Sequence, residues 1–396
     1  MVCATACLGS LFVLFVGCGD SSDLEEAKNT ILVVGDGMGA TQREAIELAS
    51  EGAYGTLIMD SLPHAGLVGT NSANTDQPVT DSAAAATAMA SGVKTYNGRV
   101  GVDTRDAALP TVLERAKDAG KAVGIVTTSS VTDATPAAFA AHVDDRSQER
   151  QIARQYLQES RPDVILGGGR RFWVPTEEEN SEDLTERARE QGYAYLTDRS
   201  GLNSASGPRL LGLFAYGAMY EDAPEGQGGS YEPTVPLRVM THKAIEVLSK
   251  DPDGFFLLVE EEAIDAMGHD GNGTLMVKAG RTLDQTVEIA KDFAEENGET
   301  LLIVVGDHEC CGLAIEKPEG GGKAGAGEDG PFPVADSDQR FLLDNSTLGH
   351  TAVDVPLTAM GPGAERLDGS YENTFIHEVM VQSMKLRAAV ESSNTH

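Results

Sequence analysis

Acidic residues and histidines follow short apolar runs at several places in this chain. Glu260 comes directly after such a run, and Asp36 and the pair Asp307 and His308 each come after a run and one glycine. A single Asp at this position is usually a turn or cap residue, and a lone His is usually part of the core. Sets that mix histidine with carboxylates are nevertheless typical of zinc sites, and all-oxygen sets are typical of magnesium sites.

Three further side chains of the same types lie elsewhere in the chain. Asp265 and His269 are four residues apart, so a helix would place both on one face as a pair of metal ligands. His350 lies in the segment LGHTAVDVP, just before the apolar stretch PLTAM. Together with His308, three of the eight histidines belong to these groups. The sequence therefore holds ligands for more than one metal ion.

The segment VTDSAAAATAMASG, residues 79–92, suggests a different kind of chemistry. Asp81 or Ser82 is a good helix N-cap, and the alanine-rich run after them favours a helix that stops at Gly92. Ser82 is then either a cap or a nucleophile at the start of the helix. The free N–H groups and the positive end of a helix favour a phosphoryl group there.

The elements that must position these residues alternate in type along the chain. Short apolar runs predict buried strands, and amphipathic stretches between them predict helices. This alternation implies an α/β fold, a three-layer sandwich with a mostly parallel central sheet and helices on both faces. Ligands of such sheets bind beyond the carboxyl ends of the strands. The predicted strands are 31–34, 122–127, 164–166, 255–259 and 301–305, and the predicted helices include 109–120, 240–248 and 277–296.

Two segments interrupt this alternation. Residues 171–232 are charged and predicted to be rich in loops, although the stretch 210–217 is apolar enough to pack. Residues 316–346 contain GGGKAGAGEDG and resemble a flexible excursion. Both are expected to be insertions into one domain, residues 30–390, and the sequence shows no internal repeat.

The N-terminal residues predict export. Residues 11–17 form an apolar run that is too short to span a bilayer and fits the core of a signal sequence. Gly17 directly before Cys18 resembles a lipoprotein processing site, so Cys18 is a candidate lipid anchor. We expect residues 1–18 to be a leader and residues 19–29 a connector, with the mature protein in the periplasm or at the cell surface.

Net charge and cysteine content exclude some classes of protein. The formal charge of −32 argues against nucleic acid or an anionic membrane surface as a partner. Outside the leader only Cys310 and Cys311 remain, so no disulfide framework is available. Adjacent cysteines could form a strained disulfide, but two reduced and buried thiols are the favoured interpretation.

Six segments, taken together, resemble the alkaline phosphatase family. They occur in the order found in that family and cover the chain from about residue 30 to 385. Each segment alone is a weak signal, whereas the combination is specific. The segments are VVGDGMG (33–39), TDSAAAATAMASGVKTYNGRVGVD (80–103), DATPAAFAAHVDDR (133–146), GFFLLVE…IDAMGHD (254–270), GDHE (306–309) and GHTAVDVP (349–356).

The resemblance implies a role for each candidate residue. Ser82 would be the nucleophile that is transiently phosphorylated, and Arg146 would grip two phosphoryl oxygens through its planar fork. Asp133 has the form associated with a magnesium site. The implied ligands are Asp265, His269 and His350 for one zinc ion, Asp36, Asp307 and His308 for a second, and Asp36, Thr135 and Glu260 for one magnesium ion.

This ligand set suits a phosphate monoester, which is a dianion attacked in line. Two zinc ions can stabilise the entering and leaving oxygens, while Arg146 takes the equatorial ones. Three divalent ions outweigh the four ligand carboxylates, so the metal-loaded pocket attracts a dianion although the whole protein is acidic. Substrate binding is therefore expected to depend on metal.

The sequence departs from the family pattern at three places. Ala266 stands where relatives often carry Lys, His or Trp, which removes a side chain able to reach the phosphate through water. Glu261 and Glu262 replace small residues and are expected to be solvated, with perturbation of the magnesium site as the alternative. Cys310 and Cys311 replace a common Thr-Gly, and we expect them to contribute packing rather than metal ligation.

The resulting prediction is an exported alkaline phosphatase with two zinc ions and one magnesium ion. A homodimer is expected because members of the family are commonly dimeric. A phosphodiesterase or a sulfatase of the same superfamily is the alternative. Arg146 favours the monoester, and Ser82 is followed by alanines rather than by the C/S-x-P-x-R context of a sulfatase. A non-catalytic metal- or phosphate-binding protein would be expected to lack the nucleophile or several ligands, and none is lacking.

Overall fold

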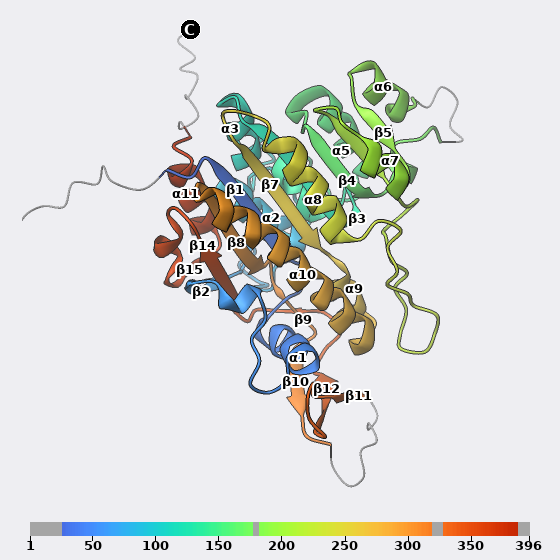
Figure 1. Ribbon diagram of the computed structural model, residues 1–396, viewed down its shortest axis with the longest axis vertical. Helices are drawn as coiled ribbons and strands as arrows, with labels where there is room; N and C mark the ends of the chain where they lie inside the picture. The colour runs from blue at the N-terminus through green and yellow to red at the C-terminus, as the bar shows by residue number, and fades with distance from the viewer. Residues whose placement is uncertain (1–25, 177–181, 319–327, 387–396) are drawn as a thin grey trace, which may run out of the picture.

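A computed structural model describes residues 26–176, 182–318 and 328–386. Its centre is a ten-stranded sheet with the order β15-β2-β14-β8-β1-β7-β3-β4-β6-β5. Among these ten strands only β14 runs antiparallel to its neighbours. Figure 1 shows α8 and α10 crossing the front of the sheet, with β10, β11 and β12 at its lower end beyond α1.

The strands of the central sheet and of two small sheets have the following bounds. They are β1 (Asn29–Gly35), β2 (His64–Gly69), β3 (Ala122–Ser130), β4 (Val164–Gly168), β5 (Ala194–Leu196), β6 (Leu210–Leu213), β7 (Phe255–Glu261), β8 (Thr300–Gly306), β9 (Glu309–Cys310), β10 (Leu313–Glu316), β11 (Glu328–Pro333), β12 (Arg340–Asn345), β13 (His350–Thr351), β14 (Val355–Met360) and β15 (Gly369–Glu372).

The helices alternate with these strands along most of the chain. They are α1 (Ala40–Ser50), α2 (Ser82–Ser91), α3 (Val112–Asp118), α4 (Ala134–Ala140), α5 (Glu149–Gln155), α6 (Leu184–Glu190), α7 (Arg199–Ser204), α8 (Leu237–Leu248), α9 (Ala263–His269), α10 (Gly273–Asn297) and α11 (Thr374–Ser383), with short helical turns at Met59–Ser61, Tyr156–Ser160, Arg170–Phe172 and Ala364–Leu367.

The two faces of the sheet bury separate cores, which confirms the three-layer α/β prediction. Successive side chains of a strand point to opposite faces. Ile31 and Val33 of β1 accordingly join the core formed with α1, α8 and α10. Leu32 and Val34 join the other core, formed with α2, α3, α4 and α11. Both faces of β1 are therefore apolar, as expected of a central parallel strand.

The five predicted strands are all present, each with the same core and slightly longer ends. In the register of the sheet Gly35 lies beside Glu261 on β7 and beside Gly306 on β8. The three strands therefore end level with one another. Whatever follows Gly35, Glu261 and Gly306 must emerge at the same edge of the sheet.

Local rules also explain where the helices begin and end. The predicted helix 109–120 is shorter at both ends, because Thr111 and Glu114 form a capping box that starts it after Pro110. Gly120, with φ of +86°, follows it as a turn residue. The other two predicted helices, 240–248 and 277–296, correspond to α8 and α10 with a few more residues at their starts.

The segments predicted to be insertions contain more regular structure than expected. Residues 171–232 contribute β5 and β6 to the central sheet, together with α6 and α7. Residues 316–346 include β11 and β12, which pair antiparallel with β10 in a small separate sheet. The leader and most of the connector lie outside the described residues. Within the described part of the chain, no helix has both the length and the apolar character needed to cross a bilayer.

Candidate active site

The central strands deliver four of the predicted ligands to one edge of the sheet. Asp36 follows β1, Glu260 is near the end of β7, and Asp307 and His308 follow β8. Because these strands end level, their side chains meet, as expected for the carboxyl edge of a parallel sheet. All four are buried.

Asp36, Asp307 and His308 form what we call the inner group. His308 Nε2 lies 3.4 Å from Asp36 Oδ1 and 3.3 Å from Asp307 Oδ2, and the three side chains are 0–4% exposed. Their ligand atoms lie within 4.8 Å of one another. Burial, and then the nearby Asp307 carboxylate, raise the pKa of Asp36 well above its usual value. Two carboxylates this close repel each other, and a divalent cation between them would relieve that repulsion.

Asp265, His269 and His350 form the outer group. His269 Nε2 is 3.0 Å from Asp265 Oδ2 and 3.1 Å from His350 Nε2, and His350 Nε2 is 3.6 Å from Asp265 Oδ1. α9 does place Asp265 and His269 on one face, and the two-stranded ribbon β9–β13 supplies His350. The rings of His308 and His350 stack with centroids 3.6 Å apart, so the two groups adjoin.

Ser82 is the first residue of α2 and not its cap. The cap is Asp81, whose Oδ1 accepts a hydrogen bond of 2.9 Å from the N–H of Ala84. The hydroxyl of Ser82 is therefore not needed to cap the helix. Its Oγ lies 3.2 Å from His308 Nε2 of the inner group. Ser82 is 4% exposed, at the positive end of a ten-residue helix.

Arg146 lies in the loop after α4 and is held by two carboxylates. Its Nη1 donates to Asp81 Oδ2 at 3.3 Å, and its Nη2 donates to Asp133 Oδ1 at 3.1 Å. Asp133 caps α4 and also accepts a hydrogen bond of 2.9 Å from Ser129 Oγ. The same carboxylate that caps α2 therefore also orients Arg146 beside Ser82.

The side chains expected to hold magnesium gather behind the inner group. Thr135 is in the first turn of α4 and is buried, as is Glu260. Burial raises the pKa of Glu260 to about 8, and the 2.6 Å hydrogen bond that its Oε2 accepts from Thr127 Oγ1 opposes this rise. The oxygen-rich composition of this set suits magnesium.

Several buried oxygens of these groups have no hydrogen-bond partner within the protein. Buried polar atoms normally have one, so each orphan calls for a ligand. Carboxylate, hydroxyl and imidazole donors also match the chemistry of zinc and magnesium. The residues therefore fit divalent cations, and the unpartnered atoms are Asp36 Oδ1, Thr135 Oγ1, Asp265 Oδ1 and Asp307 Oδ2.

Sequence reasoning missed the groups that orient these ligands. Thr127 and Ser129 bond Glu260 and Asp133, respectively. His269 Nδ1 contacts the carbonyl oxygen of Leu348 at 2.5 Å, which directs its Nε2 toward the outer group. The polar run TTSS at the end of the apolar run 122–126 was the available signal for the first two. The contact between His269 and the Leu348 carbonyl depends on the conformation of the loop before β13, and no sequence pattern indicated it.

The expected solvation of Glu261 is wrong. Glu261 is fully buried, and its carboxylate accepts hydrogen bonds from Tyr231 Oη and, at 2.7 Å, from Thr128 Oγ1. β7 is two residues longer than predicted, so Glu261 belongs to the strand and points into the protein. Burial raises its pKa to about 7. Glu262 is only partly exposed, and its Oε2 is buried.

The clustered ligand groups and the α/β fold suit a metal-binding hydrolase, and comparison with known proteins gives the family. A family model described as alkaline phosphatase matches residues 27–329. The alkaline phosphatase of Escherichia coli is 35% identical over 421 aligned residues, covering 93% of this chain and 88% of that protein. The chain belongs to the alkaline phosphatase family and is a phosphatase that acts on phosphate monoesters.

Solved structures agree with this assignment. A variant of the alkaline phosphatase from the bacterium TAB5, with magnesium bound in a metal site, is 30% identical with a TM-score of 0.76, covering 92% of this chain and 100% of that chain. The alkaline phosphatase of Thermus thermophilus is 26% identical with a TM-score of 0.78 and covers 92% of both chains. The ligand groups of this chain are consistent with metal cofactors.

Proposed function

We propose that the enzyme hydrolyses phosphate monoesters through a phosphoserine formed on Ser82. The observation that carries this proposal is the position of the Ser82 hydroxyl, 3.2 Å from His308 Nε2 and at the start of α2. The hydroxyl of a capping serine would accept a hydrogen bond from the first N–H groups of the helix. Here the carboxylate of Asp81 accepts that hydrogen bond instead. Ser82 is left available to attack phosphorus.

The proposed cofactors are two zinc ions and one magnesium ion. The inner and outer groups would each hold one zinc ion, and Asp36, Thr135 and Glu260 would hold magnesium. When bound, the ions stabilise negative charge on the entering and leaving oxygens and make the serine hydroxyl more acidic. The magnesium-bound TAB5 variant supports the third site, as does the oxygen-only ligand set of this chain.

Arg146 is proposed to bind the two phosphoryl oxygens that do not react. Asp81 and Asp133 hold its guanidinium from two sides and set its plane before substrate arrives. The first N–H groups of α2 and the positive end of that helix favour the phosphate attached to Ser82. A monoester offers two free charged oxygens to this fork, and a diester offers fewer.

The test compares Ser82→Ala with Ser91→Ala, a buried serine at the other end of the same helix. With an aryl phosphate monoester as substrate, Ser82→Ala is expected to lose at least about 10³-fold in kcat because the covalent step is removed. Ser91→Ala should retain activity near that of the wild type. Full turnover by Ser82→Ala, or activity that survives thorough removal of metal, would refute the proposal.

The proposed setting of the enzyme is outside the cytoplasm. Export rests on the apolar run at residues 11–17, and the candidate lipid anchor rests on Cys18. A homodimer is proposed from the resemblance to the family. Mass measurement of the mature N-terminus and the molar mass in solution test these three points together.

A further inference from the structure

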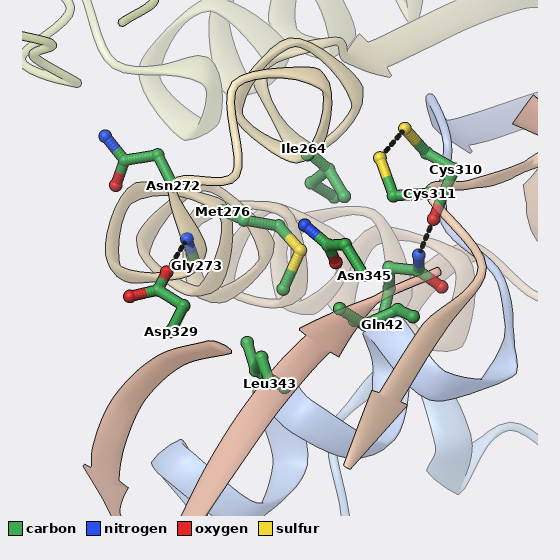
Figure 2. A pocket seen from close by; sticks show the side chains of 12 residues that line it. Gln42, Ile264, Asn272, Gly273, Met276, Cys310, Cys311, Asp329, Leu343 and Asn345 are labelled. Atoms are coloured by element: carbon green, nitrogen blue, oxygen red, sulfur yellow. Dashed lines mark hydrogen bonds between the residues drawn. The ribbon is translucent and has the colours of Figure 1, made fainter. Parts of the chain in front are cut away.

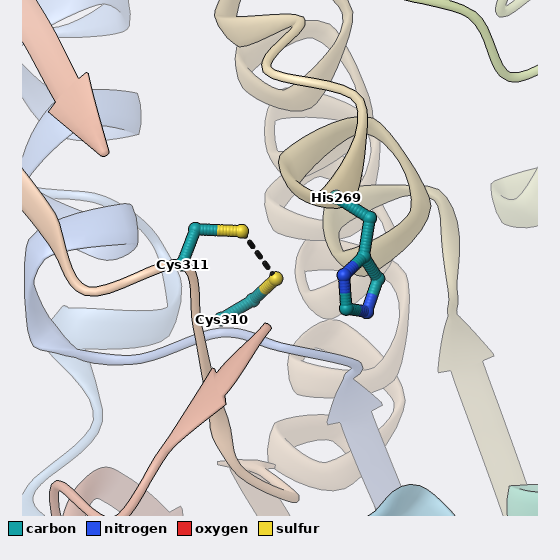
Figure 3. Close-up of side chains that lie close together, drawn as sticks. All are labelled: His269, Cys310 and Cys311. Atoms are coloured by element: carbon teal, nitrogen blue, oxygen red, sulfur yellow. Dashed lines mark hydrogen bonds between the residues drawn. The ribbon is translucent and has the colours of Figure 1, made fainter. Parts of the chain in front are cut away.

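Cys310 and Cys311 form a pair of thiols directly behind the outer group. Both side chains are 1% exposed, their Sγ atoms are 2.7 Å apart, and both cysteines are free. Figure 3 shows the imidazole of His269 facing the two sulfurs across a short gap. One ligand atom from each of the three residues lies within 4.8 Å of the others.

The pair contacts the elements that carry the outer group. Cys310 Sγ lies 3.8 Å from the carbonyl oxygen of Asp265 on α9. Cys310 also pairs with His350 in the ribbon β9–β13. α9 approaches the thiols so closely that a Cβ atom at Gly268 would lie 3.1 Å from Cys310 Sγ and 3.3 Å from Cys311 Sγ. The glycine therefore leaves the face of α9 open toward both sulfurs.

A small cavity adjoins the thiols. It has a volume of about 10 Å³, and Cys310, Cys311, Gln42, Met276 and Asn345 are among its lining residues (Figure 2). Two thiolates on one zinc-like ion, at about 2.3 Å from it, would lie roughly 3.8 Å apart, so the sulfurs must separate from their present positions. The adjacent cavity provides space for that small movement.

We propose that Cys310, Cys311 and His269 form an additional site for a thiophilic metal ion such as Cd²⁺, Cu⁺ or excess Zn²⁺. Two thiolates and one imidazole are the donors that such ions prefer. On binding, each thiol releases its proton to solvent and its sulfur lone pair forms a bond to the ion. No electron is transferred, so no oxidant or reductant is needed.

The site shares one imidazole with the outer group. His269 Nε2 faces Asp265 and His350, and its Nδ1 contacts the Leu348 carbonyl oxygen. An ion on the thiols that binds His269 would compete with these partners for the imidazole ring. The His269 side chain is 38% exposed and marks the entry side. The ion is therefore expected to weaken the outer group, a consequence that rests on the proposed zinc site.

The test follows Cd²⁺–thiolate charge-transfer absorption in the full chain. Cys3, Cys7 and Cys18 are replaced by serine so that the pair supplies the only thiols. Protein already loaded with zinc and magnesium, whose inner and outer groups are occupied, should show a band that saturates at one added Cd²⁺ per chain. Cys310→Ser combined with Cys311→Ser should abolish it, with circular dichroism confirming that the fold is retained. The absence of a saturable band, or its persistence in the double variant, would overturn the proposal.

A second measurement tests the shared histidine. His269→Gln should weaken Cd²⁺ binding at the thiols about tenfold or more, as for loss of an ordered ligand. The matched variant His242→Gln changes an exposed histidine on α8 and should leave the band unchanged. If both variants bind Cd²⁺ with equal affinity, His269 is not a ligand of this site. Because the band is read without substrate, failure of this site is distinguishable from failure of the Ser82 mechanism.

Discussion

The inner and outer ligand groups contain the same residue types but are built on different kinds of support. The inner group follows two central strands whose register is fixed by neighbours on both sides, and its side chains are 0–4% exposed. The outer group rests on the seven-residue helix α9 and the two-stranded ribbon β9–β13. Its side chains are 10–38% exposed.

This difference in support predicts which ligand group is displaced more easily. A central parallel strand cannot shift without breaking ladders on both sides and exposing two cores, so the inner group is rigid. Short elements with few neighbours open at lower free energy. The outer group is therefore expected to exchange its ion more readily, and it is also the group that the thiol pair contacts.

The largest expected effect breaks the inner group. Asp36→Asn should lower kcat/KM for an aryl monoester by about 10³-fold, because Asp36 belongs to both the proposed zinc set and the proposed magnesium set and the substitution removes a negative charge from each. His350→Ala, in the outer group, should lose about 10–100-fold and recover in part when zinc is added. Steady-state kinetics across a zinc titration measure both.

Circular dichroism of the two variants serves as the control for folding. If Asp36→Asn and His350→Ala lose the same factor in kcat/KM and recover equally when zinc is added, the two groups do not differ in rigidity. Full recovery of Asp36→Asn alone would reverse the assignment of inner and outer roles.

A smaller effect is expected from a residue that only orients a ligand. Thr127→Val removes the 2.6 Å hydrogen bond to Glu260 and should weaken magnesium binding about tenfold. Thr128→Val is the matched control, since the next hydroxyl along β3 bonds Glu261 instead. Magnesium-dependent activation and direct magnesium titration measure the change. Equal affinities in the two variants would show that Thr127 does not position Glu260.

The last effect concerns the stability of the fold rather than the rate, at the C-terminal end of α2. His377 of α11 contacts the Ala90 carbonyl oxygen at 2.8 Å, and burial, together with Arg115, lowers its pKa from 6.5 to about 4. The unfolded chain therefore binds this proton first as pH falls. The neutral histidine contributes stability above about pH 6.5 that is lost progressively toward pH 4, up to about 3 kcal/mol.

His377→Gln should accordingly flatten the fall of unfolding free energy between pH 6.5 and 4. Denaturant unfolding at several pH values provides the measurement. A variant whose stability depends on pH as steeply as that of the wild type would show that other groups cause the acid sensitivity.

Much of the fold was predictable because its central strands are buried on both faces. Such strands appear in the sequence as continuous apolar runs, and the acidic residues and histidine at the ends of three of these runs were visible without any structure. The prediction was less accurate where pairing partners are distant. β5 and β6 lie in a segment predicted to be rich in loops. The strand that became β7 was predicted to end before Glu261, whose buried carboxylate accepts hydrogen bonds from Thr128 and Tyr231.

The sequence by itself determined the types of ligand and their order. Asp265 and His269 share a face because a helix repeats every 3.6 residues, and the strand-end residues meet because parallel strands end at one edge. Only the tertiary structure decided that Asp81 caps α2 so that the Ser82 hydroxyl faces His308. The same holds for Cys310 and Cys311, whose sulfurs face His269 because β9, β13 and α9 come together from distant parts of the chain. Local periodicity can be recognised from neighbouring residues in the sequence, whereas these contacts depend on how separate elements pack.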